Sequence, residues 1–302
     1  MDEKYKMNVK SVQPGQIAGC VKAPPSKSMM LRAVAAAALA EEKAFILNPT
    51  FCDDARAGLE ILESLGASVT ETTDVIEIKS GGPAQNVTLN CRESGLCARM
   101  FAPIAALYSQ EITLTGTGSL LRRPMKIMEA PLAELGVSCS TDQGFLPVKI
   151  KGPMKAGKIR IDASLTSQFL SGLLLALPHC RQDSRIISDN LHSKPYVLMT
   201  LSMLSHCGIS VDVERNLSQF FVSGGQRCGQ FSYRVEGDWS GSAFLLVGGA
   251  LAGCVTVEDL QVDSFQADRK ILDVLKQCGA NIKVKENSVT AGRGSLEGFH
   301  FN

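Results

Sequence analysis

Residues 24–32 of the chain read PPSKSMMLR, and an alanine-rich stretch, Ala33–Leu39, follows them. Because proline is excluded from helix interiors and serine is a preferred N-cap, the pattern predicts a helix that begins near Ser26. A helix start presents unpaired N–H groups and a partial positive charge, to which Lys27 and Arg32 add cations. The stretch therefore has the chemistry of a phosphate or carboxylate site. Taken by itself, it is explained more simply as a capped helix with solvated cations.

The size and charge of the chain restrict its class. With 302 residues, 45% of them hydrophobic, it can bury a large core and has the length of two domains. Its net charge is only +1, so the chain lacks the broad basic character that binding to nucleic acid or a membrane requires. The longest apolar runs, Phe169–Pro178 and Ala243–Cys254, are shorter than the ~20 residues that cross a bilayer. We therefore expect no nucleic-acid or membrane partner, and any affinity for anions must come from local clusters.

Cysteine and histidine residues show no ligand pattern. The ten cysteines include no Cys-x-x-Cys pair, and the four histidines form no His-Glu-x-x-His motif. The sequence has no glycine-rich nucleotide-binding loop either. Its first residues lack the hydrophobic segment of a signal peptide, so we interpret the cysteines as reduced thiols of a cytoplasmic protein. The sequence thus predicts neither a metal nor a nucleotide cofactor.

A repeat of about seventy residues organises the chain. Four similar segments contain Gly66, Gly136, Gly208 and Gly279, which lie 70, 72 and 71 residues apart. Each segment is typical of a helix that a glycine in the left-handed conformation terminates. The segments are Leu62–Ala67, Leu132–Val137, Met203–Ile209 and Val274–Ala280.

The surroundings of these segments repeat as well and predict a β-α-β-α-β-β unit. Its opening strands are expected at Gly19–Lys22, Val87–Asn90, Lys158–Asp162 and Ser232–Glu236. The first helix of each unit is apolar nearly all round, which is typical of a buried helix, at Ala33–Leu39, Met100–Leu107, Phe169–Leu177 and Ala243–Leu251. Several strands alternate between apolar and charged residues, so one face of each lies in water. The sequence therefore predicts an α+β fold of repeated units, an inside-out α/β prism with buried helices and outer sheets.

Polar residues recur where the first helices should begin. Ser26, Ser94, Ser167 and Ser240 lie 40, 42, 41 and 39 residues before the terminating glycines. In a threefold arrangement the first three helix starts would converge on one end of the domain. The second helices add cations and a hydroxyl next to a proline at the expected first helical position, in Arg122–Pro124 and Ser193–Tyr196. Together these positions favour one anion pocket over a set of unrelated solvated cations.

At this point the sequence resembles the EPSP synthase family, which comprises the 3-phosphoshikimate 1-carboxyvinyltransferases. The resemblance covers essentially the whole chain. It is carried, in order along the chain, by Pro25–Ser28 with Arg32, Ser94–Gly95 with Arg99, Arg122–Pro124, Thr166–Phe169, Ser193–Tyr196 and Glu236–Asp238.

The resemblance implies a reaction and a set of ligands. The enolpyruvyl group of phosphoenolpyruvate would pass to the 5-hydroxyl of shikimate 3-phosphate in the shikimate pathway, with release of phosphate and no metal or organic cofactor. Lys27 would be catalytic and would touch both substrates. Shikimate 3-phosphate would also contact Ser28, Arg32 (at its carboxylate), Thr166, Ser167, Gln168, Ser193 and Tyr196, with Lys194 a further candidate at the phosphate. Phosphoenolpyruvate would also contact Gly95, Arg123 and Gln168.

The resemblance also sets the expected domains. Residues 20–236 would form a complete three-unit domain on the shikimate 3-phosphate side. Residues 1–19, whose strand Val9–Gly19 would pair with the C-terminal part, and residues 237–302 would form an incomplete second domain on the phosphoenolpyruvate side. Because family members have six units and an acidic proton-transfer residue beyond Asn302, the 302-residue chain is expected to bind shikimate 3-phosphate without appreciable turnover. Leu96 and Glu93 replace a threonine and an asparagine that are frequent in the family, which affects the expected affinity for phosphoenolpyruvate.

Two alternatives stay open at the level of the sequence. One is the sister activity that transfers enolpyruvate to a UDP-amino sugar; the Ser-Lys-Ser and Thr-Ser-Gln motifs suit a small phosphorylated ring better. The other is a non-catalytic, anion-binding protein that retains the first domain. We expect a monomer in each case.

Overall fold

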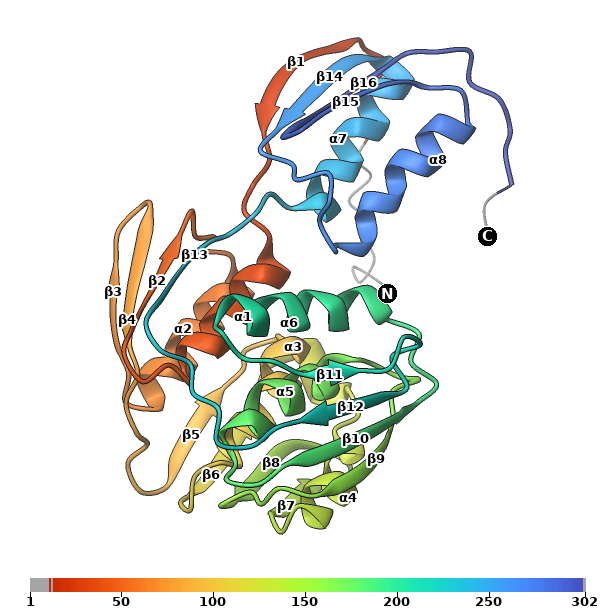
Figure 1. Ribbon diagram of the computed structural model, residues 1–302. Helices are drawn as coiled ribbons and strands as arrows, with labels where there is room; N and C mark the ends of the chain where they lie inside the picture. Colours follow the sequence, from red (N-terminus) through yellow and green to blue (C-terminus); the bar gives the residue numbers. More distant parts are fainter. Residues whose placement is uncertain (1–10, 12, 301–302) are drawn as a thin grey trace, which may run out of the picture. The chain divides into compact units, whose positions relative to one another are not determined.

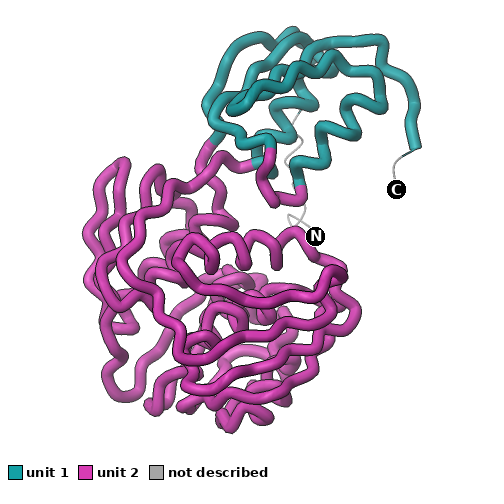
Figure 2. The backbone as a smooth tube through the Cα atoms, viewed as in Figure 1, with its two compact units in different colours: residues 1–23, 239–262, 268–302 teal, residues 24–238, 263–267 magenta. Residues whose placement is uncertain are grey.

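The structure, a computed structural model, describes residue 11 and residues 13–300, and the chain divides into two compact units (Figure 2). Unit 2 comprises Pro24–Asp238 and Asp263–Ala267, all of which are described. Unit 1 comprises the chain up to Ala23, Trp239–Val262 and the chain from Asp268 onward. That these units fold as separate domains, with the boundaries expected from the sequence, stays a prediction.

Unit 2 contains three modules, each with a four-stranded sheet. The sheets have the strand orders β13-β2-β4-β3, β5-β6-β8-β7 and β11-β12-β10-β9. Their strands are β2 (Lys43–Leu47), β3 (Ser68–Glu71), β4 (Val75–Lys79), β5 (Val87–Asn90), β6 (Glu111–Thr115), β7 (Ser138–Asp142), β8 (Phe145–Lys151), β9 (Lys158–Asp162), β10 (Ser184–Asp189), β11 (Asp212–Val213), β12 (Gln219–Val222) and β13 (Phe231–Arg234). The helices of the unit are α1 (Lys27–Ala37), α2 (Asp53–Ser64), α3 (Gly95–Ala105), α4 (Glu129–Glu134), α5 (Gln168–Ala176) and α6 (Lys194–His206) (Figure 1).

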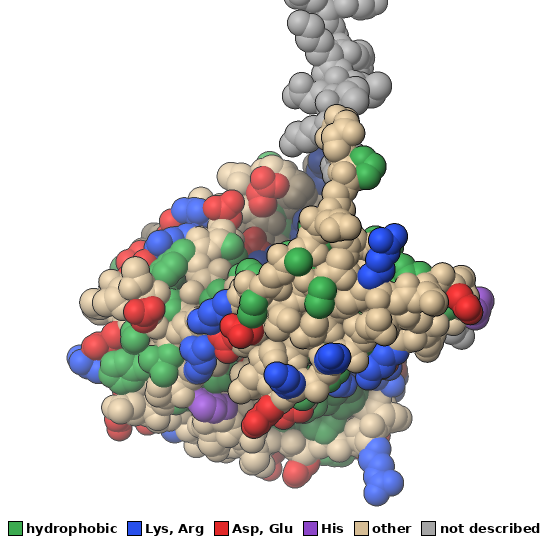
Figure 3. All heavy atoms as spheres, turned by 90° about the horizontal axis from the view of Figure 1, so that it is seen from above, with side chains coloured by type: hydrophobic (Ala, Val, Ile, Leu, Met, Phe, Trp, Pro, Cys, Tyr) green, Lys and Arg blue, Asp and Glu red, His purple; other side chains and the backbone are tan. Residues whose placement is uncertain are grey.

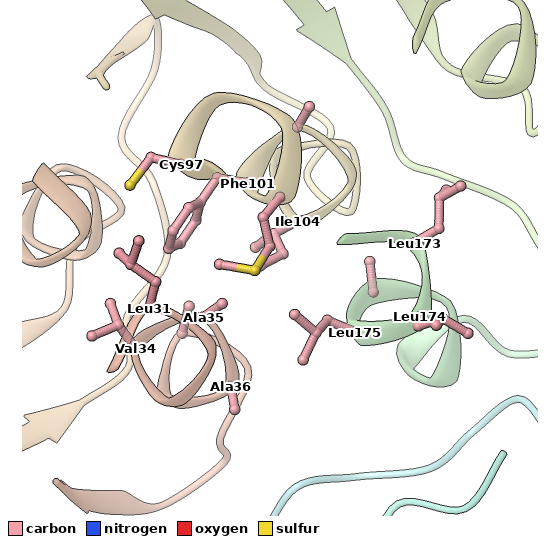
Figure 4. Packing of buried hydrophobic residues seen from close by; sticks show 14 of the residues in the cluster. Leu31, Val34, Ala35, Ala36, Cys97, Phe101, Ile104, Leu173, Leu174 and Leu175 are labelled. Carbon is pink, nitrogen blue, oxygen red and sulfur yellow. The ribbon is translucent and has the colours of Figure 1, made fainter. Parts of the chain in front are cut away.

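The helices α1, α3 and α5 form the interior of unit 2, and the sheets lie outside them. All residues of α1 from Met29 onward and all of α5 from Phe169 onward are buried. In Figure 4, Leu31 of α1 lies beside Phe101 of α3, and Leu175 of α5 faces the same interior. Strands such as β8 and β9 alternate between buried and exposed residues, as a sheet with one wet face requires. The predicted arrangement of inner helices and outer sheets is confirmed for this unit.

The four glycines of the repeat terminate helices as predicted. Gly66, Gly136, Gly208 and Gly279 have φ of 85°, 76°, 74° and 85°, a conformation that glycine adopts without steric cost. In each case the glycine amide donates to the carbonyl three residues earlier, and the next amide donates to the carbonyl five residues earlier. This pair of bonds is the Schellman motif, which satisfies carbonyls that the helix end leaves open.

Unit 1 contains a module of the same order. Its sheet has the order β1-β14-β16-β15, from β1 (Ile17–Lys22), β14 (Gly253–Glu258), β15 (Asn281–Lys285) and β16 (Ser288–Gly292). Its helices are α7 (Trp239–Ala252) and α8 (Ile271–Gln277). The strand expected at Val9–Gly19 lies partly outside the described residues; its last part, Ile17–Gly19, belongs to β1 and pairs with β14, as expected of a strand that joins the C-terminal part.

The prediction that all four first helices are buried is wrong for α7. Phe244 is 82% exposed and Leu251 is 58% exposed. Among the described residues, α7 packs on β14 and β16 and more lightly on α8 and β1, which leaves much of its circumference uncovered. Apolar composition therefore predicts burial only where enough neighbouring surface exists.

The opening strand of the first module does not join the sheet of that module. Instead β1 pairs in parallel with β14, from Ile17 opposite Gly253 to Lys22 opposite Glu258. The first module takes its parallel strand from β13, which pairs with β2. Assigning Gly19–Lys22 to the first unit and Ser232–Glu236 to the fourth was wrong, because the order of strands along the chain does not tell which strands pair.

The surface has no predominance of one charge on the face that Figure 3 shows, where basic and acidic side chains are interspersed. Among residues 11 and 13–300, no helix is long and apolar enough to cross a bilayer. The same residues contain no group of three or more His, Cys, Asp or Glu side chains arranged to hold a metal ion.

Candidate functional site

A cavity of about 470 Å³ in unit 2 collects the predicted site residues. Every residue that we predicted as a ligand of either substrate lines it, except the further candidate Lys194. Asp54, Glu93 and Leu96 line it as well. The predicted residues in its wall are Lys27, Ser28, Arg32, Gly95, Arg123, Thr166, Ser167, Gln168, Ser193 and Tyr196.

Three helices begin at this cavity, and the N-terminus of each carries a partial positive charge. Lys27, Gly95 and Gln168 are the first residues of α1, α3 and α5, and all three line it. Ser26 and Ser94 cap the first two helices as predicted. The Ser26 hydroxyl accepts a hydrogen bond from the Met29 amide at 3.4 Å, and Ser94 does the same for Cys97 at 3.3 Å. Converging helix starts give the cavity a positive potential that favours anions.

The other two serine caps differ from the prediction. Ser167 precedes α5 but makes no side-chain cap bond, because its ψ of 0° is not the extended conformation that an N-cap uses. Thr166 takes over part of this task, since its hydroxyl accepts from the Gln168 amide at 3.2 Å. Ser240 lies inside the first turn of α7, which begins at Trp239, and its hydroxyl donates to Asp268 instead.

The two proline-containing starts also differ from each other. Pro195 is the second residue of α6, one position later than predicted, and Ser193 is the N-cap residue. Pro124 begins no helix, since the next α-helix of that module starts at Glu129. The backbone of Arg123 is extended, the conformation that a residue before proline prefers. The Met125 amide, just after this proline, donates to the Gly144 carbonyl at 2.7 Å.

Arg32 forms a rigid part of the cavity wall. Its side chain is almost fully buried, and it donates to the Thr200 hydroxyl at 2.9 Å and to the carbonyls of Ser28 and Tyr196, both at 2.8 Å. A guanidinium has five N–H groups, so these three bonds fix its plane and leave donors for a ligand. Burial lowers the pKa of Arg32 to about 10, which still leaves it charged at neutral pH.

Lys27 is paired with a carboxylate that the sequence did not suggest. Its Nζ lies 3.1 Å from Oδ2 of Asp54, and its side chain is 51% exposed. Partial burial lowers the pKa of Lys27, but the hydrogen bond and charge of Asp54 outweigh this and raise it overall. The side chain is therefore held as a protonated cation. Asp54 gave no signal because an acidic residue in the first turn of a helix, here α2, is an ordinary stabiliser.

Gly95 leaves room for two guanidinium groups. A Cβ at this position would lie 2.9 Å from Nη1 of Arg123 and 3.0 Å from Nη1 of Arg99. Arg99 donates to Oε1 of Gln168 at 2.9 Å and to the Pro124 carbonyl at 3.0 Å, so it fixes a side chain of the cavity. Burial and the nearby Arg123 lower the pKa of Arg99. Two cations in one place favour an anionic partner.

Glu93 adds a negative charge to the wall. Its Oε2 accepts from the Ser119 amide at 2.8 Å. This backbone bond and a side-chain bond from Ser119 lower the pKa of the Glu93 carboxyl, so it is ionised at neutral pH.

Comparison with known proteins shows the family of the chain. The model of the EPSP synthase (3-phosphoshikimate 1-carboxyvinyltransferase) family matches residues 12–302. A 3-phosphoshikimate 1-carboxyvinyltransferase of Clostridium beijerinckii is 35% identical over 295 residues, which cover 94% of this chain and 67% of the relative. One of Methanocorpusculum labreanum is 37% identical over 291 residues, covering 95% and 68%.

Solved structures show the same fold. An EPSP synthase of Acinetobacter baumannii superposes with a TM-score of 0.77 at 24% identity, over 96% of this chain and 68% of that one. The chain thus spans about two thirds of the length of the relatives that it matches. From the family match and the curated relatives, the chain belongs to the EPSP synthase family.

Proposed function

We propose that the cavity of unit 2 is the shikimate 3-phosphate site of this enzyme. The family uses shikimate 3-phosphate and phosphoenolpyruvate as substrates and serves the shikimate pathway as an enolpyruvyl transferase. One observation carries the proposal: three helix N-termini and three cations, those of Lys27, Arg32 and Arg123, line a single cavity. Such a site suits a small, multiply charged acid, because fixed dipoles and charges replace the water that the anion loses.

The two anionic groups of shikimate 3-phosphate need different donors. We assign the carboxylate to Arg32 with Ser28, since a planar guanidinium matches a carboxylate in geometry. We assign the phosphate to the hydroxyls of Thr166, Ser167 and Ser193, which line the cavity at the starts of α5 and α6. Gln168 and Tyr196 would then flank the ring.

Phosphoenolpyruvate would occupy the part of the cavity near Gly95, Arg123 and Gln168. Lys27 would lie beside both substrates, where its ammonium offsets their mutual repulsion. Because Asp54 raises the pKa of Lys27, the side chain stays an ammonium, which suits it to neutralise charge more than to transfer a proton. The monomeric state and the cytoplasmic location stay predictions.

Calorimetric titration tests the assignment of the phosphate. The chain is titrated with shikimate 3-phosphate and with shikimate, and the same two titrations are repeated on the double variant Ser167→Ala, Ser193→Ala. Hydrogen bonds to a charged group contribute roughly 1.5–3 kcal/mol each, so wild type should prefer the phosphorylated ligand by ten-fold or more. The double variant should lose most of this preference and keep its affinity for shikimate.

Two results would contradict the proposal. Wild type could bind both ligands equally, or neither, which would remove shikimate 3-phosphate as the ligand of the cavity. Alternatively, the double variant could weaken both ligands by the same factor, which would remove the phosphate from these hydroxyls. The matched control is Ser218→Ala, which removes a hydroxyl that donates to Glu214 and does not line the cavity.

A further inference from the structure

Gln266 has a buried carboxamide that does not line the cavity but contacts the N-cap residue of α1. The side chain is 6% exposed and forms hydrogen bonds to three separate residues. Its Nε2 donates to Oε1 of Glu236 at 2.9 Å and to the Gly237 carbonyl at 2.8 Å, and its Oε1 accepts from the Ser26 hydroxyl at 3.2 Å. The Gly237 carbonyl can only accept, so the orientation of the amide is determined. Gln266 therefore connects the cap of α1 to the segment that follows β13.

The same segment is the support on which the first turn of α1 rests. The Ser26 amide donates to the Glu236 carbonyl at 2.8 Å, and the Lys27 amide donates to Oδ2 of Asp238 at 3.3 Å. Residue 25 forms an isolated antiparallel bridge with residue 237. The Ser26 hydroxyl, which donates to Gln266, also accepts from the Met29 amide. The position of Lys27 and Ser28 in the cavity wall thus depends on bonds that Gln266 completes.

Gln266 comes from the fourth module, although it lies in unit 2. The segment Asp263–Ala267 follows β14 in the sequence and precedes α8, both of which belong to unit 1. Ser264 secures this segment, since its hydroxyl donates to Oε1 of Glu236 at 2.9 Å and accepts from the Gln266 amide at 3.1 Å. Within unit 2, this late segment of the chain therefore supports the helix start that lines the cavity.

We propose that Gln266 is a positioning residue for the cavity. It is not among the residues that line the cavity, so it acts through Ser26 and the first turn of α1. Loss of its carboxamide removes one hydrogen bond each from Ser26, Glu236 and Gly237 in a buried network, which loosens the helix start. Small displacements of a positioned cation reduce the affinity for an anion and the rate of a reaction that needs it.

The test combines a structural readout with a binding readout, and the binding arm rests on the proposed function. Gln266→Met keeps the length of the side chain and removes its hydrogen bonds. We expect amide hydrogen exchange in Lys27–Leu31 to accelerate ten-fold or more, and the affinity for shikimate 3-phosphate to fall ten-fold or more. Ser264→Ala, a milder change to the same network, should shift both quantities in the same direction and covers the case in which Gln266→Met does not fold.

The matched control is Gln226→Met in the same unit. The Gln226 carboxamide bonds the Ser210 amide and the Ser210 and Ser223 carbonyls, and Gln226 does not line the cavity. This control should lower the melting temperature without changing exchange in α1 or the affinity. Unchanged exchange in Lys27–Leu31 in both Gln266→Met and Ser264→Ala would overturn the proposal. If wild type itself binds no shikimate 3-phosphate, the proposed function fails, while the exchange measurement still decides the role of Gln266.

Discussion

The helices α5 and α7 are nearly alike in apolar composition but differ in how much of each is buried. Both are apolar nearly all round. Every residue of α5 from Phe169 to Ala176 is buried, whereas Phe244 and Leu251 of α7 are mostly exposed. In unit 2, α5 packs against α3 and α6, and α1 packs against α2, α3 and α6. In unit 1, as far as the structure describes it, α7 packs mainly against one sheet and lightly against α8.

The difference shows that burial is a property of a set of helices and not of one helix. The first helices of unit 2 cover one another, so each needs an apolar circumference. The same pattern on α7 contributes less stability, because the exposed part of its apolar surface stays in water and adds no hydrophobic stabilisation. Truncating a buried side chain of α5 should therefore cost more stability than truncating an exposed side chain of α7.

The largest difference is expected from truncating a leucine. Leu173 in α5 is fully buried, so Leu173→Ala should destabilise unit 2 by about 2–5 kcal/mol. Leu251→Ala in α7, where the side chain is 58% exposed, should cost less than about 1 kcal/mol. Urea unfolding followed by far-UV circular dichroism measures both, and fluorescence of Trp239, the single tryptophan, reports on unit 1. Equal losses in the two variants would show that α7 is covered to the same extent as α5.

A smaller difference is expected from adding a methyl group to a glycine. A Cβ on Gly172 of α5 would lie 2.5 Å from the Met100 carbonyl oxygen and 2.9 Å from its Cα, so α3 and α5 would have to separate. Gly172→Ala should cost about 1–3 kcal/mol. At Gly248 of α7 the nearest atom is the mobile end of Ile17, and alanine is the better helix former, so Gly248→Ala should be neutral or stabilising. If the urea concentration at the unfolding midpoint fell by a similar amount in both variants, the difference in packing between α5 and α7 would be contradicted.

Much of the fold followed from local patterns. The strands at Val87–Asn90 and Lys158–Asp162 have the bounds that the repeat predicted, and the glycine helix ends follow from the same repeat. The partner of β1 did not follow, because pairing across more than 200 residues leaves no local signal. The exposure of α7 did not follow either, since composition does not reveal what surrounds a helix.

The residues of the candidate site could be predicted from the sequence to a similar extent. Motifs at helix starts located the residues of the cavity wall, since the repeat brings equivalent positions to one end of the unit. Asp54 could not be found in this way, because its partner Lys27 lies in another helix. The role of Gln266 could not be found in this way either. Its contacts with Ser26 and Gly237 are long-range and depend on the three-dimensional fold.

Two carboxylates extend the comparison to pH. Burial raises the pKa of the Glu236 carboxyl in the folded state of unit 2. The folded state therefore favours the protonated form, and this contribution to stability is present below the ordinary pKa of a glutamate and is lost as pH rises through the folded-state pKa. Bonding to Lys270 lowers the pKa of the exposed Asp273 in unit 1, so its contribution is lost as pH falls. Glu236→Gln should therefore reduce the loss of stability between pH 4 and pH 8, and Asp273→Asn should reduce the loss on acidification. Urea midpoints at several pH values measure both, and unchanged pH profiles would contradict the assignments.

The smallest effect on stability is expected at Phe244. Its ring is 82% exposed, so Phe244→Gln should change the stability of unit 1 by no more than about 0.5 kcal/mol, as measured by Trp239 fluorescence in urea. The same change removes a large apolar group from an exposed face, so it should lower self-association at high protein concentration in sedimentation experiments. Phe101→Gln in α3, where the ring is fully buried, should destabilise unit 2 by several kcal/mol and is the matched control. A loss of more than about 2 kcal/mol in Phe244→Gln would mean that this face of α7 is covered in solution, and the contrast between the two helices would no longer hold.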